Sequence, residues 1–186
     1  MIVYLHGFNS SPQSHKARVL GEYLAKRGLG SHYACPALPP SALAAIAAIE
    51  NLIGRSRPCF VGSSLGGFYA TYLAEKHGAK AVLINPAIDP HVGLRTYLGP
   101  QKNLHTAEPY ELTEAHLREW EQLYLPHVTP SRYWLIVETG DEVLDYRRAV
   151  ERYKGARQLV IEGGDHSLQS FPQHLQGIVE FAGLAE

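Results

Sequence analysis

Short apolar runs recur along the chain, and each ends at a polar, glycine- or proline-containing stretch. Six of them predict buried strands, at residues 2–5, 32–35, 59–61, 80–84, 133–137 and 159–161. Between them, apolar residues recur at helical spacing near residues 19–24, 41–53, 65–77, 113–124, 146–153 and 171–179. Continuously apolar strands that alternate with helices are typical of a parallel sheet covered on both faces. The pattern predicts an α/β protein: a three-layer α/β/α sandwich with a mostly parallel sheet of about six strands.

Residues 86–131 interrupt this alternation. The segment is rich in proline, glycine, histidine and tyrosine, and its one clear helical pattern covers residues 113–124. It is longer than a strand-to-strand connection requires, and long excursions of this kind often cover a functional site. We expect residues 1–186 to form a single domain in which residues 86–131 are a lid or cap insertion.

One stretch carries a recognisable chemical pattern. Gly62-Ser63-Ser64-Leu65-Gly66 follows an apolar strand, precedes a helix and fits G-x-S-x-G, the nucleophile elbow. The turn in such an elbow is so tight that the flanking positions favour glycine. Ser64 occupies the nucleophile position, whereas Ser63 does not. The alternative is a glycine-rich turn whose serine has no chemical role.

The ends of other predicted strands supply partners for a serine. Asp141 follows the strand at 133–137, and His166 follows Gly163-Gly164 after the last strand. A serine hydroxyl needs a base, and an imidazole base needs a carboxylate that fixes its tautomer. The chain order Ser64, Asp141, His166 is the order that α/β-hydrolases use. Asp145 and Asp89 remain alternative candidates for the acid.

An oxyanion that forms at Ser64 would need backbone N–H donors. Leu65, directly after the nucleophile, is one expected donor, and the loop after the first strand should supply the other. We expect that second donor to be Phe8. His6 is expected to organise this loop and not to act as the base.

Several of these stretches together resemble a known family. They are Tyr4-Leu5-His6-Gly7-Phe8-Asn9-Ser10-Ser11, Gly62-Ser63-Ser64-Leu65-Gly66-Gly67-Phe68-Tyr69-Ala70, Asn85-Pro86-Ala87, Thr139-Gly140-Asp141-Glu142-Val143-Leu144-Asp145-Tyr146 and Gly163-Gly164-Asp165-His166. The chain resembles serine hydrolases of the α/β-hydrolase superfamily and, among them, the small YqiA-like esterases. The resemblance implies ester or thioester hydrolysis by a Ser64, Asp141 and His166 triad. It also implies a sheet that lacks the first two strands of the larger superfamily pattern.

Composition narrows the classes of partner. With a formal net charge of −1, no electrostatic attraction favours nucleic acid or an anionic membrane. No apolar run approaches membrane-spanning length, and we expect a cytoplasmic protein. The chain contains no Cys-x-x-Cys pair and no His pair at metal-binding spacing beside a Glu, so we expect neither metal nor cofactor. Cys35 and Cys59 are expected to be free thiols.

The sequence therefore predicts a cofactor-free serine hydrolase that cleaves small acyl esters or thioesters through an acyl-enzyme intermediate. Alternatives are a serine peptidase or amidase that uses the same triad, and a non-catalytic binding module that kept the fold. Four aromatic residues of the insertion are expected to shape the acyl pocket, unless they form the insertion's own core: Tyr97, Tyr110, Trp120 and Tyr124.

Overall fold

The computed structural model describes residues 1–184 and contains a six-stranded sheet in the order β2-β1-β3-β4-β7-β8. Its strands are β1 (Ile2–Leu5), β2 (Tyr33–Ala34), β3 (Cys59–Ser63), β4 (Ala81–Ile84), β7 (Tyr133–Glu138) and β8 (Arg157–Ile161). Every neighbouring pair in this sheet is parallel. The predicted fold class is confirmed, with the second strand shorter than expected.

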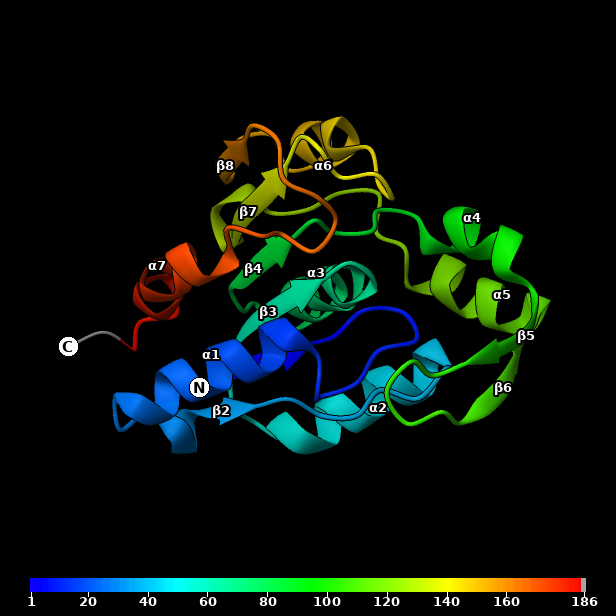
Figure 1. Cartoon of the computed structure of the whole chain (residues 1–186), viewed down its shortest axis with the longest axis horizontal. Coiled ribbons are helices and arrows are strands. Elements are labelled where there is room, and N and C mark those ends of the chain that lie inside the picture. Colours follow the sequence, from blue (N-terminus) through cyan, green and yellow to red (C-terminus); the bar gives the residue numbers. More distant parts are fainter. Residues whose placement is uncertain (185–186) are drawn as a thin grey trace.

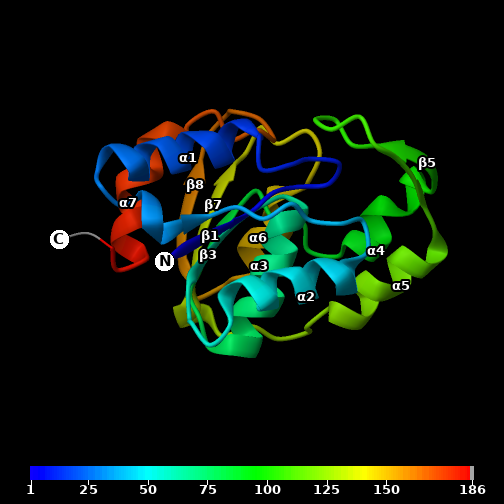
Figure 2. The ribbon, with the colours of Figure 1, turned by 90° about the horizontal axis from the view of Figure 1, so that it is seen from below.

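Both faces of the sheet are buried. Successive side chains of each strand point to opposite faces, so each strand contributes to two hydrophobic clusters. In β1, Val3 and Leu5 pack into one hydrophobic cluster, whereas Ile2 and Tyr4 pack into the other. The first cluster is covered by α2 (Ala42–Ile53), α3 (Leu65–His77), α5 (Glu114–Leu123) and α6 (Tyr146–Arg152), and the second by α1 (His15–Lys26) and α7 (Leu175–Phe181). Figures 1 and 2 show these helices on opposite sides of the sheet.

Short 3₁₀ helices connect several of these elements. They are η1 (Gly30–His32), η2 (Leu94–Tyr97), η3 (Pro130–Arg132) and η4 (Phe171–His174). The helix expected over 171–179 is therefore divided, because η4 precedes α7. None of the helices within residues 1–184 is both long and apolar enough to cross a membrane.

The insertion between β4 and β7 contains a hairpin that the sequence did not predict. After α4 (Pro90–Gly93) and η2, strands β5 (Gly99–Lys102) and β6 (Pro109–Leu112) pair antiparallel in a small sheet of their own. Each of these strands contains a proline and lacks an apolar run, so no strand pattern was visible. The hairpin contacts the loop after β1, where the Leu104 N–H donates to the Asn9 carbonyl over 2.8 Å. It therefore lies beyond the carboxyl edge of the main sheet (Figure 1).

Helix α5 joins the insertion to the core. Trp120 is 1% exposed, and its indole N–H donates to the Tyr69 hydroxyl over 2.8 Å. The Ser41 hydroxyl, at the start of α2, donates to the Glu119 carboxylate over 2.8 Å. Trp120 is thus a core residue in this structure and does not line an open pocket.

Candidate functional site

Ser64 lies in the sharp turn between β3 and α3. Its backbone has φ 54° and ψ −121°, a conformation that residues with a side chain rarely adopt. A Cβ at Gly62 would lie 2.2 Å from the Gly66 carbonyl oxygen, and one at Gly66 would lie 1.9 Å from that of Leu5. Only glycine fits at these two positions. The local geometry is therefore that of a nucleophile elbow.

The loops after β3, β7 and β8 bring Ser64, Asp141 and His166 together. The Nε2 atom of His166 is 3.0 Å from the Ser64 Oγ. On the other side of the ring, Nδ1 is 2.8 Å from the Asp141 Oδ2. The three side chains form one continuous hydrogen-bonded chain.

The Asp141 side chain is 1% exposed, and its surroundings favour the ionised form. Burial alone would raise the pKa of this carboxyl, but hydrogen bonds from His166 and from the Leu144 and Val143 N–H groups outweigh burial and lower it. Both N–H groups donate to Oδ1 over 2.8 Å. An ionised Asp141 accepts from Nδ1–H, which leaves Nε2 of a neutral imidazole free to accept the Ser64 proton.

The other candidate acids have different partners. Asp145 caps α6 by accepting from the Arg147 N–H over 3.1 Å, and Asp89 pairs with Arg148 over 2.7 Å. Within residues 1–184, neither carboxylate bonds the His166 ring. Asp165 accepts from the Ser167 N–H over 2.8 Å and so shapes its own loop. Of the candidates, the structure brings Asp141 to the imidazole.

The loop after β1 passes directly beside Ser64. A Cβ placed on Gly7 would lie 3.3 Å from the Ser64 Cβ, a tight contact, so glycine at residue 7 favours the close approach of this loop. Phe8 follows in this loop, and Leu65 is the first residue of α3. An N–H at that helix position has no partner inside the helix. Both expected oxyanion donors thus belong to the backbone next to Ser64.

His6 has hydrogen-bond partners that differ from those of His166. It is buried, its Nδ1 is 3.1 Å from the Gly7 carbonyl oxygen, and its Nε2 accepts from the Leu38 N–H over 3.2 Å. Burial lowers the pKa of this imidazole. His6 therefore ties the loop after β1 to the segment after β2.

Two polar residues beside the site had no role assigned from the sequence, although Asn85 lies in one of the stretches that carry the family resemblance. Glu138 ends β7 and Asn85 follows β4, and both are buried. The Asn85 side chain donates to the carbonyl oxygens of Asp165 and His166 over 3.1 and 3.2 Å. A carboxylate at the end of an otherwise apolar run was the available signal for Glu138.

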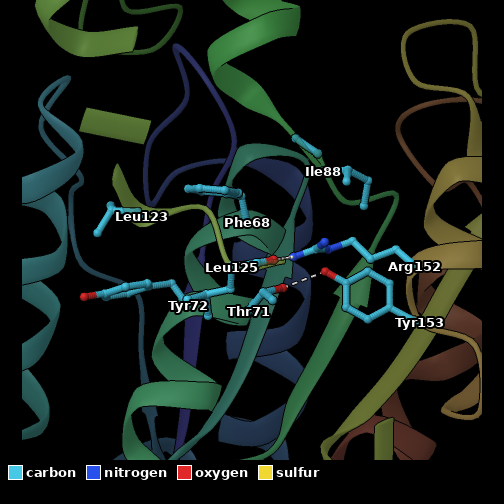
Figure 3. A pocket seen from close by; sticks show the side chains of 9 residues that line it. Phe68, Thr71, Tyr72, Ile88, Leu123, Leu125, Arg152 and Tyr153 are labelled. Atoms are coloured by element: carbon cyan, nitrogen blue, oxygen red, sulfur yellow. Dashed lines mark hydrogen bonds between the residues drawn. The ribbon is translucent and has the colours of Figure 1, made fainter. Parts of the chain in front are cut away.

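A narrow pocket lies between α3 and α6 (Figure 3), lined by Phe68, Thr71, Tyr72, Ala87, Ile88, Leu123, Leu125, Arg152 and Tyr153. Figure 3 shows the Arg152 guanidinium donating to the Leu125 carbonyl oxygen and the Thr71 hydroxyl paired with that of Tyr153. A wider groove of about 610 Å³ adjoins it and includes Tyr124. Thus Tyr124, unlike Trp120, lines accessible space.

The described part of the chain contains no group of side chains that could coordinate a metal ion. Across residues 1–184, no three His, Cys, Asp or Glu side chains are grouped so that they could hold an ion.

Solved structures with the same fold span nearly the whole chain. Mouse alpha/beta hydrolase domain-containing protein 10 has a TM-score of 0.74 and 17% identity, with 96% of this chain and 87% of that chain covered. Est1E from Butyrivibrio proteoclasticus, solved with ferulic acid, has a TM-score of 0.67 and 15% identity, with 97% and 86% covered. The Paleococcus ferrophilus monoacylglycerol lipase has a TM-score of 0.66 and 19% identity, with 99% and 94% covered. These similarities show an α/β-hydrolase fold.

Sequence comparison gives the family. UPF0227 protein PC1_2487 from Pectobacterium carotovorum subsp. carotovorum (strain PC1) is 24% identical over 190 residues, which cover 99% of each chain. Residues 1–183 match the family described as "Uncharacterised protein family (UPF0227)". The chain belongs to the UPF0227 family.

Proposed function

We propose that this protein is a serine hydrolase that cleaves small acyl esters or thioesters through an acyl-enzyme intermediate. The observation that carries the proposal is the hydrogen-bonded chain from Ser64 Oγ through His166 to Asp141, which starts at a strained elbow. Such a chain supplies a nucleophile, a base and a group that orients the base.

In the proposed reaction, Ser64 Oγ attacks the acyl carbon and its proton passes to His166 Nε2. The negative charge that develops on the carbonyl oxygen is stabilised by the N–H groups of Phe8 and Leu65. His166 then gives its proton to the departing alcohol or thiol, which leaves the acyl group on Ser64. A water molecule attacks the carbonyl carbon of this ester and gives a proton to His166 Nε2. The bond from the acyl carbon to Ser64 Oγ then breaks, His166 returns the proton to Ser64 Oγ, and the carboxylic acid leaves the restored enzyme.

The names of similar proteins favour esters over amides. The esterase domain of a Rhodothermus marinus protein, a monoacylglycerol lipase and Est1E with bound ferulic acid share the fold over nearly the full length of this chain. The family resemblance seen in the sequence points the same way. We therefore assign ester or thioester cleavage first, and comparison of matched ester and amide substrates tests that order.

Active-site labelling tests the assignment of the nucleophile. A fluorophosphonate probe should label the wild-type protein, and Ser64→Ala should abolish labelling. The matched control is Ser63→Ala, which removes the neighbouring buried hydroxyl and should largely preserve labelling. A folded Ser64→Ala protein that labels at the wild-type rate would show that the nucleophile is another residue. A wild-type protein that neither labels nor cleaves any ester or thioester would favour a binding module instead.

A further inference from the structure

Glu138 holds the loop that carries His166. Its Oε2 accepts from the Asp165 N–H over 2.9 Å and from the Gln169 N–H over 3.1 Å. Its Oε1 accepts from the Ser170 N–H over 3.0 Å and from the Ser170 hydroxyl over 2.6 Å. Four donors on both sides of His166 thus converge on one buried carboxylate.

The loop is shaped around this carboxylate. Gly164 has φ +69°, and a Cβ there would lie 1.9 Å from Glu138 Oε2, so only glycine lets the loop approach so closely. Asn85 completes the attachment, because its Oδ1 accepts from the Glu138 N–H over 3.1 Å while its Nδ2 donates to the His166 carbonyl oxygen. The ends of β4 and β7 therefore hold the loop jointly.

All polar groups of His166 have partners in this arrangement. Its N–H donates to Glu142 over 3.0 Å, its carbonyl accepts from Asn85, and its ring lies between Asp141 and Ser64. Glu138 touches neither the ring nor Ser64. It accepts from the backbone of Asp165, directly before His166, and from that of Gln169 and Ser170, three and four residues after it.

We propose that Glu138 is a positioning residue of the proposed hydrolysis: its carboxylate fixes the loop from Gly164 to Ser170 so that His166 keeps its hydrogen bonds to Ser64 and Asp141. This inference rests on the proposed function of the site. Burial would raise the pKa of Glu138, but hydrogen bonds from Ser170, Asp165 and Gln169 lower it, and the carboxylate is held in its charged form. Hydrogen bonds to a charged acceptor are stronger than those to a neutral one, so a carboxylate with four donors restrains the loop firmly.

Glu138→Gln tests the proposal with little change in volume. The amide keeps one acceptor oxygen but turns an NH₂ group towards two of the four donors, so one side of the loop loses its anchor. We expect kcat for an activated aryl acetate to fall about a hundredfold, the cost of a displacement of about 1 Å at a reacting group, with KM within about twofold.

Glu75→Gln is the matched control. Glu75 is also a carboxylate with several partners, which accepts from the Thr129 N–H over 2.6 Å, from the Tyr133 hydroxyl over 2.7 Å and from Arg132 over 2.8 Å. None of these three hydrogen-bond partners belongs to the loop that carries His166. Glu75→Gln should lower the melting temperature, as Glu138→Gln should, but its kcat should stay within about twofold of wild type.

A proton NMR signal separates this inference from the proposed function. The proton shared by His166 Nδ1 and Asp141 should give a far-downfield resonance in wild type and in Glu75→Gln, and this resonance should be lost or broadened in Glu138→Gln. That pattern supports positioning by Glu138 even if no ester is cleaved, in which case the proposed function alone fails. A folded Glu138→Gln protein that keeps both the resonance and kcat overturns the inference, and so does an equal fall of kcat in the two variants.

If Glu138→Gln does not fold, Ser170→Ala provides the test. It removes the hydroxyl that donates to Oε1 and that also lies 3.1 Å from His174 Nε2. We expect about a fivefold fall in kcat at unchanged KM, the equivalent of the hydrogen bond to Oε1. Wild-type kcat together with an unchanged downfield resonance would overturn the proposal.

Discussion

At the scale of single residues, the site depends on a strained serine held from several directions. The Ser64 N–H donates to the Ile84 carbonyl over 3.1 Å, and the Ser64 carbonyl accepts from the N–H groups of Gly67 and Ala87 over 2.9 and 3.0 Å. A positive φ at a residue other than glycine costs about 1–3 kcal/mol and persists where the surroundings determine it. Here hydrogen bonds to β4, to the segment that follows it and to the first turn of α3 do so.

The acid of the proposed triad gives the most direct residue-scale prediction. Asp141→Asn should lower kcat by about ten-thousandfold, because the amide N–H favours the wrong imidazole tautomer, as the same replacement does in serine proteases. Asp145→Asn and Asp89→Asn should each cost about tenfold or less, because these carboxylates cap a helix and pair with Arg148. The rates are to be measured on folded proteins with one activated ester.

A different ranking would reassign the acid. If Asp145→Asn or Asp89→Asn caused the larger loss, that residue would take the role of Asp141. If all three variants kept near wild-type rates, His166 would work without a carboxylate partner or would not be the base.

Single residues also show why part of the site could be predicted and part could not. Ser64, Asp141 and His166 follow glycines at strand ends, and that local signal is visible in the sequence. Glu138 and Asn85 act through bonds to residues 27 to 81 positions away, and no local pattern in the sequence points to those bonds, although Asn85 lies in a stretch that carries the family resemblance. Only the folded chain shows that both bond the same loop.

At the scale of elements, the predicted strands and helices of the sheet layer agree with the structure, whereas the insertion differs. Its helix α5 had a clear apolar face, which packs on the core through Leu117 and Trp120. Its hairpin had no such pattern and is held instead by side-chain hydrogen bonds to the loop after β1. The Tyr110 hydroxyl donates to Asn9 Oδ1 over 2.5 Å, and Asn9 Nδ2 donates to Gln101 over 3.0 Å.

These contacts link the insertion to the loop that carries the expected oxyanion donor. Asn9, at φ 53°, directly follows Phe8, the expected oxyanion donor. Tyr110→Phe removes one hydroxyl bond to Asn9 and should lower kcat about fivefold, the equivalent of one hydrogen bond, to the same extent for esters of every acyl length. Acyl esters of graded length provide the measurement.

Tyr97→Phe is the control for this prediction. The ring of Tyr97 packs edge-on against Phe8 at 5.8 Å and its side chain is half exposed, so loss of its hydroxyl should leave kcat unchanged. If the effect of Tyr110→Phe instead grows with acyl length, the hairpin contacts the substrate and acts as the lid that the sequence suggested.

At the scale of the whole molecule, two carboxylates with several hydrogen bonds, the half-buried Glu75 and the buried Glu138, connect elements that are distant in sequence. Glu75 joins α3 to η3 and β7, and Glu138 joins β7 to the loop before η4. Burial would raise the pKa of both carboxyls, but their hydrogen bonds outweigh burial and lower it. The unfolded chain therefore binds protons at these sites more readily than the folded chain does, and acid should favour unfolding.

Because these folded-state pKa values are lowered, the stabilisation is complete above the unfolded pKa of about 4.3 and is lost as pH falls through the lower folded values. Lowered pKa values of His6 and His174, caused by burial, should add a smaller loss of stability that begins below about pH 6.5. The free energy of unfolding of wild type and Glu75→Gln should therefore differ most between about pH 5 and 7. The difference should shrink as pH falls through the lowered folded pKa of Glu75, below which the carboxyl is protonated and resembles glutamine. Urea titrations at each pH measure both proteins. A difference that stays constant from pH 7 to pH 3 would mean that the Glu75 carboxylate has the same pKa in the folded and unfolded chain.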